Sequence, residues 1–455
     1  MPVRATKAPS EEDDPLNAIT VWSDVAPTSD GSLDGFTAVV KDCIAVSGLP
    51  MTAGSELLAD FCPREDSTVV ERLRASGALI VGMGRMDELG LAAGGDTGLG
   101  GAVLNPFDRS RTAGGSSAGA AASLHYDDVQ VAIGADQGGS VRVPAAWCGV
   151  YGLKPTAGLV PATGTLGVDH TIDHVGPLAR TITDLAAVLD AISGPDGHDP
   201  RQPDMSEPEV CSEAATAPPT DLRGIRLGLL TQCSSEAHGV EPSVRRAMDG
   251  VVKALVGLGA EIVPVDLPEH STAGAIMFGT SVEGMSALLA AGGNGYQWRG
   301  KYWPELAAAI ARGWAGAARL GPAAKAALIA GSHLRGSFRG EWYAQAQNAR
   351  RSLVAGYERA LDGVDALICP TTPGLPHAVD RTLSNSERVL RGWSVLANTA
   401  AANLTGHPSL SMPIAESHGL PVGVMLTGHM FDEAALVHIA AVCERELGTR
   451  PGSPG

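Results

Sequence analysis

The sequence is poor in aromatic residues, in cations and in long uncharged stretches. Aromatic residues make up 4% of the 455 residues, and 33 lysines and arginines face 50 aspartates and glutamates, which gives a formal net charge of −17. Binding to nucleic acid and to anionic membranes depends on clustered cations, so this balance argues against both partners. We also find no run of about 18 uncharged apolar residues, the length that a membrane-spanning helix needs.

Cysteine is scarce and scattered. The seven cysteines are odd in number, widely spaced and contain no Cys-x-x-Cys pair. This pattern supports neither a disulfide framework nor a zinc ribbon. Residues 1–14 carry four acidic residues where a signal peptide would need an apolar core. We therefore expect reduced thiols and a cytoplasmic protein.

Glycine and proline, by contrast, are plentiful: 57 and 30 residues without a fixed period, which is typical of a turn-rich globular enzyme. Between these turns, segments with the pattern of strands and helices alternate, which predicts an α/β fold whose sheet is covered by helices on both faces. The expected strands are Phe36–Val40, Ile44–Val46, Ala78–Val81, Val129–Ile133, Arg226–Leu230 and Ile262–Val265, and the expected helices are Ser67–Gly77, Ile182–Ile192 and Val244–Leu258.

The domain organisation is simple. Residues 1–34 are polar and contain four prolines, so we expect a poorly structured arm, followed by one large domain over residues 35–447 and a flexible tail over residues 448–455. The proline-rich and acidic stretch 194–219 is either a linker or a long surface loop. We favour the loop, because the strand and helix pattern resumes unchanged after it.

Two glycine-rich segments each end in serine: Thr112–Gly119 with Gly-Gly-Ser-Ser, and Gly134–Arg142 with Asp-Gln-Gly-Gly-Ser. Consecutive glycines let backbone N–H groups turn inward and approach a ligand, as an oxyanion hole requires. The alternative is a pair of flexible turns. Lys41 ends an apolar strand, where lost hydration would lower its pKa and make it a usable base, although the strand by itself favours an edge lysine that reaches water.

These three segments, in this order, resemble the amidase signature family of serine hydrolases. Lys41 precedes Ser116 by 75 residues, and Ser116 precedes Ser140 by 24. The similarity continues through residues 147–156, 402–408 and 419–423. It is close over residues 35–199 and 363–447 and loose over the variable, substrate-side region 200–360. The resemblance implies a single domain with a central mixed sheet.

The resemblance also implies the roles of individual residues. Ser140 is the expected nucleophile that forms an acyl-enzyme, Ser116 the bridging serine after a cis peptide bond, and Lys41 the neutral base. The backbone N–H groups of Gln137, Gly138, Gly139 and Ser140 are expected to hold the oxyanion, with Ser117, Asp136 and Arg142 in support. No cofactor and no metal are expected.

Two other patterns offer alternatives. Gly115–Gly119 also matches the nucleophile elbow of α/β-hydrolases, but that motif needs a buried strand before it, and residues 105–111 contain a proline and three charged side chains. The pairs Asp169-His170 and Asp173-His174 have the residue types of metal ligands. Glycines around them argue for a loop, and no third ligand cluster is evident.

For the substrate, the segments 136–140, 171–177 and 199–202 look most similar to amidases that accompany nitrile hydratases, which hydrolyse small carboxamides to acid and ammonia. The alternatives are a specialised amidase acting on a carboxylated urea-type amide, an anilide or a biosynthetic amide, or a scaffold without turnover. A component of glutamyl-tRNA amidotransferase is disfavoured, because it needs partner subunits and an ammonia tunnel. We expect a small-molecule amide as the partner, no nucleic acid and no membrane, and leave a homodimer open.

An aromatic cluster lies within the variable region. Trp298, Tyr302 and Trp303 account for a large share of the scarce rings, and aromatic side chains commonly line pockets for apolar acyl groups. We expect them at the mouth of the Ser140 site, the alternative being a helix that packs its rings into the core.

Overall fold

The computed structural model describes residues 6–204, 210–216 and 218–450. Within them the chain forms one mixed sheet of twelve strands, in the order β1-β2-β4-β3-β5-β7-β6-β11-β12-β10-β8-β9. The strands are β1 (Thr6–Lys7), β2 (Ile19–Val25), β3 (Thr37–Lys41), β4 (Leu79–Gly84), β5 (Val131–Asp136), β6 (Tyr151–Lys154), β7 (His174–Ala179), β8 (Arg226–Leu230), β9 (Glu261–Val265), β10 (Ala366–Pro370), β11 (Ser409–Ser417) and β12 (Leu420–Gly428).

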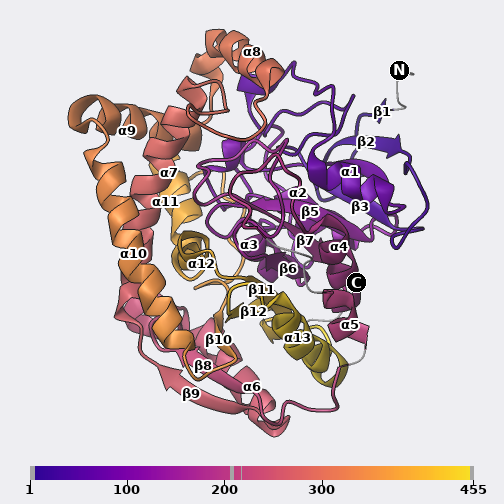
Figure 1. Cartoon of the computed structure of the whole chain (residues 1–455), viewed down its shortest axis with the longest axis vertical. Helices are drawn as coiled ribbons and strands as arrows, with labels where there is room; N and C mark the ends of the chain where they lie inside the picture. The colour runs from indigo at the N-terminus through magenta and orange to yellow at the C-terminus, as the bar shows by residue number, and fades with distance from the viewer. Residues whose placement is uncertain (1–5, 205–209, 217, 451–455) are drawn as a thin grey trace.

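Helices cover both faces of this sheet, which confirms the expected architecture (Figure 1). One face carries α1 (Thr68–Ala75), α4 (Ile182–Ile192), α5 (Cys211–Thr216), α6 (Pro242–Gly257) and α13 (Glu433–Leu447), and the other carries α2 (Ala118–Ala122) and α3 (Arg142–Cys148). Strand side chains alternate between two cores: Val40 and Ile133 pack with α1 and α4, whereas Val39 and Ala132 pack with α2 and α3.

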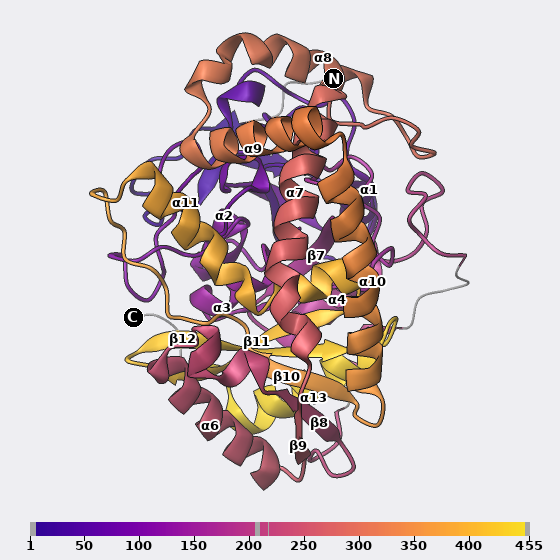
Figure 2. The ribbon, with the colours of Figure 1, turned by 90° about the vertical axis from the view of Figure 1, so that its left-hand side faces the viewer.

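A separate layer of helices stands beside the sheet. In Figure 2, α7 (Ala273–Ala290) and α10 (Glu341–Leu361) run side by side. The other members are α8 (Pro304–Gly313), α9 (Pro322–Phe338), α11 (Asn385–Ser394) and α12 (Ala400–Thr405). The stretch Pro268–Ala290 is long and apolar enough to cross a membrane, although it contains Glu269 and Glu283 and is therefore not an uncharged run. Of its 18-residue apolar window, 67% is buried within the fold, as in a helix of a domain core.

The N-terminal segment is not the loose arm that we expected. Its strand β2 pairs antiparallel with β4, and Ile19 and Val25 are buried. Asp14 anchors the entry to β2, because its carboxylate accepts hydrogen bonds from the N–H groups of Ala18 (2.7 Å) and Ile19 (3.0 Å). Residues 1–5 of the expected arm and residues 451–455 of the expected tail lie outside the described residues.

Most elements agree with the expected ranges, and α4 and β8 agree to the residue. The stretch Ile44–Val46 is an exception: it is a buried loop with a single bridge from Ile44 to Thr165, because the chain turns after Lys41. The long loop 194–219 contains the short helix α5, whose first N–H groups donate to Asp190.

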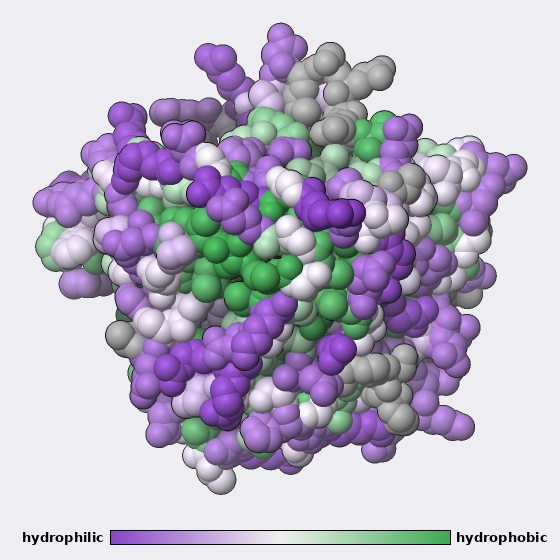
Figure 3. All heavy atoms as spheres, turned by 90° about the horizontal axis from the view of Figure 1, so that it is seen from below, coloured by the Kyte–Doolittle hydropathy of each residue, from purple (hydrophilic) through white to green (hydrophobic). Residues whose placement is uncertain are grey.

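Seen from below, the surface is mixed: Figure 3 shows apolar side chains gathered near the middle of this face, with polar ones around them. A shallow groove also lies between α6 and β11, lined by Ala247, Val251, Ala254, Ile414 and Leu447 and flanked by Arg246 and Arg450.

Candidate active site

Lys41 is buried at the end of β3, between β4 and β5. Its side chain lies on the Val39 face of the strand, and Nζ donates to Ser116 Oγ at 2.7 Å and to the carbonyl of Ala135 at 2.9 Å. Burial lowers the pKa of Lys41, because a desolvated ammonium is disfavoured. The lysine therefore does not reach water, and its amine is directed at a serine hydroxyl.

The segment from Gly114 to Ser117 leads into α2. The peptide bond between Gly115 and Ser116 is cis, as the family resemblance implies. Ser116 is fully buried, while Ser117 donates its N–H to the carbonyl of Ser140 (3.0 Å) and its hydroxyl to the carbonyl of Ala135 (3.2 Å). These bonds fix the bridging serine against the loop that carries Ser140.

Ser140 lies in the loop between β5 and α3, and 4% of its surface is exposed. Asp136, the last residue of β5, shapes this loop: its carboxylate accepts from the N–H groups of Gly139 (2.7 Å) and Val141 (3.0 Å). Arg142 binds the same carboxylate with two nitrogens, each at 3.0 Å. Burial alone would raise the pKa of Asp136, but the Arg142 guanidinium and these hydrogen bonds hold it well below its usual range.

The C-terminal part of the chain supports the loop from behind. Thr399 Oγ1 donates to the carbonyl of Gly138 (2.6 Å), and the Thr399 carbonyl accepts from Arg142 (3.0 Å). Asn403 binds Asp136 through Nδ2 and Arg142 through Oδ1 (2.9 and 2.6 Å). Asp136 and Arg142 are thus bound to each other and to α12, and their charges are directed away from Ser140.

The expected oxyanion donors differ in availability. The N–H of Gly139 is engaged by Asp136, so the expectation that it holds the oxyanion is wrong for this structure. The N–H groups of Gln137, Gly138 and Ser140 take no acceptor within the described part of the chain. These three are the donors that the loop leaves for a developing negative charge.

A small apolar pocket opens beside Ser140. Besides the loop itself, it is lined by Gly90, Leu91, Ala92, Val168, Met277, Ser281, Trp393 and Leu396. We did not expect these residues from the sequence, since they come from four separate segments. The capping box at Ser384, with Glu387 three residues on, could have shown that a helix begins there and carries Trp393.

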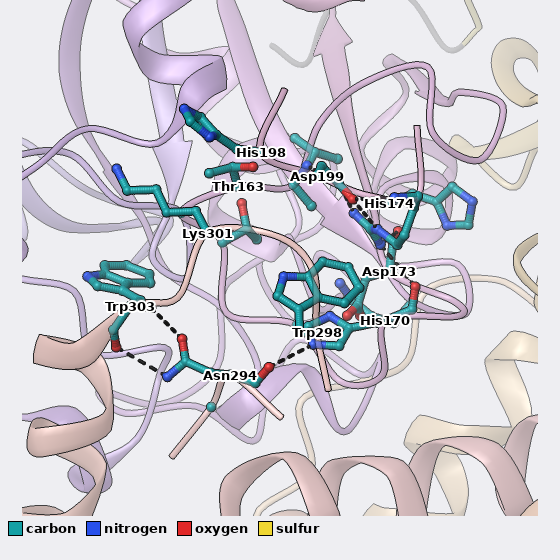
Figure 4. A pocket seen from close by; sticks show the side chains of 18 residues that line it. Thr163, His170, Asp173, His174, His198, Asp199, Asn294, Trp298, Lys301 and Trp303 are labelled. Atoms are coloured by element: carbon teal, nitrogen blue, oxygen red, sulfur yellow. Dashed lines mark hydrogen bonds and ion pairs between the residues drawn. The ribbon is translucent and has the colours of Figure 1, made fainter. Parts of the chain in front are cut away.

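Two of the three predicted aromatic residues, Trp298 and Trp303, line a different, charged pocket, which shares Gln137 with the first (Figure 4). Trp298 stacks on His170 with 4.1 Å between ring centroids, and Trp303 packs against Phe61. Tyr302 is 44% exposed and accepts a hydrogen bond from the Trp298 N–H. The structure therefore does not bring Trp298, Tyr302 and Trp303 to the Ser140 pocket.

The residues of the metal alternative, Asp169, His170, Asp173 and His174, lie in the loop before β7 and at its start. Asp173 accepts from the N–H of Val168 (2.8 Å), and His170 Nε2 lies 3.2 Å from the carbonyl of Asn294. Across residues 6–204, 210–216 and 218–450, no group of three or more His, Cys, Asp or Glu side chains is arranged to hold a metal ion.

Comparison with known proteins identifies the class. A family model described as Amidase matches residues 21–437, and the chain belongs to this family. Similar chains include a glutamyl-tRNA(Gln) amidotransferase subunit from Natronomonas pharaonis, 37% identical over 92% of this chain and 98% of the relative. The subunit of the same name from Anaeromyxobacter sp. (strain K) is also 37% identical, over 93% of this chain and 84% of its own.

Solved structures agree on the fold. The subunit of that name from Thermotoga maritima superposes with a TM-score of 0.78 at 25% identity, covering 98% of this chain and 95% of its own. The peptide amidase of Stenotrophomonas maltophilia gives a TM-score of 0.74 at 29% identity, covering 93% and 85%. The chain is thus similar both to an amide hydrolase and to one component of an amidotransferase.

These relatives correct our expectation about partners. We took the acidic charge to exclude nucleic acid and expected a small-molecule amide as the partner. Chains that match this one over more than nine tenths of its length are named for a tRNA and for their place in a multi-subunit enzyme. The net charge of this chain therefore excludes neither a nucleic acid nor partner subunits.

Proposed function

We propose that the protein is a specialised amidase that cleaves the C–N bond of a biosynthetic amide through an acyl-enzyme on Ser140. The observation that carries the proposal is the 2.7 Å hydrogen bond from the buried Lys41 amine to Ser116, beside the loop of Ser140. A buried lysine directed at a serine has the geometry of a base that activates a hydroxyl.

In this mechanism the neutral Lys41 amine takes the proton of Ser116 as Ser116 takes that of Ser140. Ser140 Oγ then attacks the carbonyl carbon of the amide, and its C–O bond forms while the carbonyl oxygen becomes an oxyanion. The free N–H groups of Gln137, Gly138 and Ser140 stabilise that charge. Ser116 gives its proton to the leaving nitrogen while Lys41 returns a proton to Ser116, and the C–N bond breaks. Water then takes the place of the amine: it gives a proton to Ser116 as Ser116 gives one to Lys41, its oxygen bonds to the acyl carbon, and Ser140 leaves with a proton from Ser116, which Lys41 reprotonates.

A biosynthetic amide fits the relatives better than a simple carboxamide does. The curated relatives reported above bear the name of an enzyme that transfers an amide nitrogen within aminoacyl-tRNA chemistry. This similarity covers 92% of the chain and therefore includes the catalytic segments as well as the helices around them. It favours a specialised substrate over the small carboxamides of the enzymes that accompany nitrile hydratases.

A second candidate is an amidotransferase component, in which the released ammonia passes to an acceptor. The observation in its favour is again the similarity to amidotransferase subunits over nearly the whole of both chains. Both candidates share the cleavage of a C–N bond at Ser140. They differ in whether release of ammonia depends on partner subunits and an aminoacyl-tRNA.

The test is ammonia release from a panel of amides, alone and with glutamyl-tRNA(Gln) and amidotransferase partner subunits. An amidase releases ammonia alone, whereas an amidotransferase component does so at a useful rate only with its partners. Covalent labelling of Ser140 by a fluorophosphonate separates either enzyme from a scaffold without turnover. If the intact protein neither labels at Ser140 nor releases ammonia under any of these conditions, the proposal fails.

A further inference from the structure

The pocket beside Ser140 presents no charged side chain to the group that enters it. Its walls are the side chains of Leu91, Ala92, Val168, Met277, Trp393 and Leu396. Two further side chains, Gln137 and Ser281, are polar but uncharged, and the Ser281 hydroxyl is already engaged by the carbonyl of Met277 at 2.6 Å. An acyl group on Ser140 therefore meets a mainly apolar surface.

The apolar walls touch the catalytic loop itself. A Cβ atom built on Gly138 would lie 3.4 Å from Leu396 Cδ1 and 3.8 Å from the Met277 sulfur. On the opposite side, a Cβ atom built on Gly90 would lie 3.7 Å from Ser116 Oγ and 3.5 Å from Gln137 Oε1. The space between these walls is thus the space next to the serine hydroxyls, and a side chain at residue 90 would enter it.

The charges of the neighbouring helix are held away from the pocket. In α11, Arg388 and Arg391 both bind the buried carboxylate of Asp96, at 3.1 and 2.7 Å. The carbonyl of Gly392 accepts from the N–H of Ala93 at 3.2 Å. These bonds hold α11 against the segment that follows Leu91 and place Trp393 in the wall of the pocket, where Phe278 packs on its ring at 5.6 Å.

We infer that the acyl part of the amide is uncharged and apolar, of the branched-alkyl or aryl class, and that Trp393 and Leu396 select it. This inference rests on the proposed function, since it concerns the acyl group transferred to Ser140. A carboxylate or an ammonium in this pocket would lose its hydration without a counter-charge. The amino-acid head of glutamine carries both charges and therefore does not fit.

The first experiment compares kcat/KM for ammonia release from benzamide with that from glutamine and from succinamate, in the intact protein. We expect benzamide to exceed both charged amides by about a hundredfold or more, since a pocket that cannot pair a charge rejects it strongly. Equal or faster release from glutamine or succinamate, with or without glutamyl-tRNA(Gln) and partner subunits, overturns the inference.

Variants test the two selecting residues. W393A should lower kcat/KM for benzamide by about tenfold or more and change that for acetamide less than about threefold, because acetamide is too small to reach the ring. W393F retains an aromatic ring and should restore most of the benzamide rate. W342A is the matched control, because Trp342 is 48% exposed on α10, and it should change neither rate. If W393A and W393F each lower kcat/KM for benzamide and for acetamide by the same factor, Trp393 does not select the acyl group.

For Leu396, L396R places a cation in the wall that touches Gly138. It should raise the ratio of succinamate to benzamide turnover by about tenfold, since the carboxylate then finds a counter-charge. An unchanged ratio in a variant that still folds and labels at Ser140 contradicts the placement of the acyl group against Leu396.

Binding to the variant S140A keeps this inference separate from the proposed function. Calorimetry should detect benzamide and no glutamine at equal concentrations, whether or not the wild-type protein turns over either. Benzamide binding without turnover of any amide by the wild type would refute the proposed function and support the apolar pocket. Binding of glutamine, or of neither compound, would refute the apolar pocket.

Discussion

The two pockets on either side of Gln137 differ in how they treat charge. The pocket beside Ser140 is lined by uncharged side chains, whereas its neighbour contains Asp173, Asp199, Arg201 and Lys301. Both pockets adjoin the same catalytic loop, through Gln137. The difference shows that proximity to the loop does not determine the chemistry of a pocket. The segments that complete each wall determine it: helices α7 and α11 beside Ser140, and the loops that carry Asp173, Asp199 and Lys301 in the neighbouring pocket.

The charges of the second pocket serve its own structure. Arg201 binds Asp199 through two nitrogens and donates to the carbonyls of His170 and Asp173 at 3.1 and 2.9 Å. Burial raises the pKa of Asp173 to about 6, although the nearby cations oppose this shift. The arginine thus fastens the loop before β7 to the loop after α4, and Trp298 closes over it by stacking on His170.

The largest expected effect on activity comes from Ser140, which belongs to the apolar pocket and not to the charged one. S140A should reduce ammonia release by about 10⁴-fold or more, because no other group takes the acyl chain. S116A should retain a small residual activity, since Ser140 then loses only its proton acceptor. The thermal midpoint of both variants should stay close to that of wild type, because the removed hydroxyls are small. Activity of S140A near the wild-type level would rule out the assignment.

The next largest effect is expected from Asp136, whose ion pair shapes the catalytic loop, whereas the ion pair of Asp199 lies in the charged pocket. D136N leaves Arg142 buried without its counter-charge and should lower the free energy of unfolding by about 3–5 kcal/mol. Because the folded pKa of Asp136 lies below the unfolded value, its contribution is fully present at neutral pH and is lost as the pH falls through the folded pKa.

The control is D199N, which weakens a similar pair in the charged pocket. It should also destabilise the fold but leave kcat/KM for a good substrate within about threefold, because Asp199 does not shape the catalytic loop. Urea unfolding followed by assays of the folded fraction measures both quantities. Equal activity losses in D136N and D199N would contradict the separation of the two pockets.

The pH dependence sharpens the role of Lys41. Burial lowers its pKa, and only the neutral amine accepts a proton. Below that pKa, kcat/KM should therefore fall by about tenfold for each pH unit, and above it the rate should level off. A profile from pH 5 to 9, measured with an uncharged amide, tests this. A chemical step whose rate falls as the pH rises, or full activity of K41A, would remove Lys41 from the mechanism.

The smallest expected effect concerns Trp298. W298A should cost about 1 kcal/mol of stability, the usual value of a stacked pair, and leave the preference between benzamide and propionamide within about twofold. Thermal unfolding and the ratio of kcat/KM for the two amides measure these effects. A change of tenfold or more in that ratio would show that the charged pocket contributes to acyl specificity after all.

Much of the fold could be predicted from the sequence because its elements have clear local signals. Thr181 caps α4 by accepting from the N–H of Asp184 at 3.1 Å, as its spacing indicates. Strand β2 was missed, because its residues Ile19–Val25 include Thr20, Ser23 and Asp24 and lie between prolines. Its pairing with β4, about 60 residues further along the chain, produces no signal within the segment.

The site, like the fold, could be predicted where its residues lie in local sequence motifs. The residues Lys41, Ser116 and Ser140 stand in short motifs of fixed spacing, so the sequence alone singles them out. Met277, Trp393 and Leu396 belong to helices far from those motifs, and only the tertiary fold brings them to Ser140. Trp298 and Trp303 were placed in the wrong pocket because proximity in the sequence does not show which wall a side chain joins.

The bonds from Thr399 and Asn403 to the catalytic loop have a consequence for synthesis on the ribosome. A nascent chain contains Lys41, Ser116 and Ser140 when less than a third of it has been made. Until residues 399–403 emerge, more than 250 residues after Ser140, the carbonyl of Gly138 lacks the Thr399 hydroxyl and the carboxylate of Asp136 lacks the Asn403 amide. We therefore expect the hydroxyl of Ser140 not to react with amides during most of translation. A prematurely terminated product should likewise be inert toward amides in the cell.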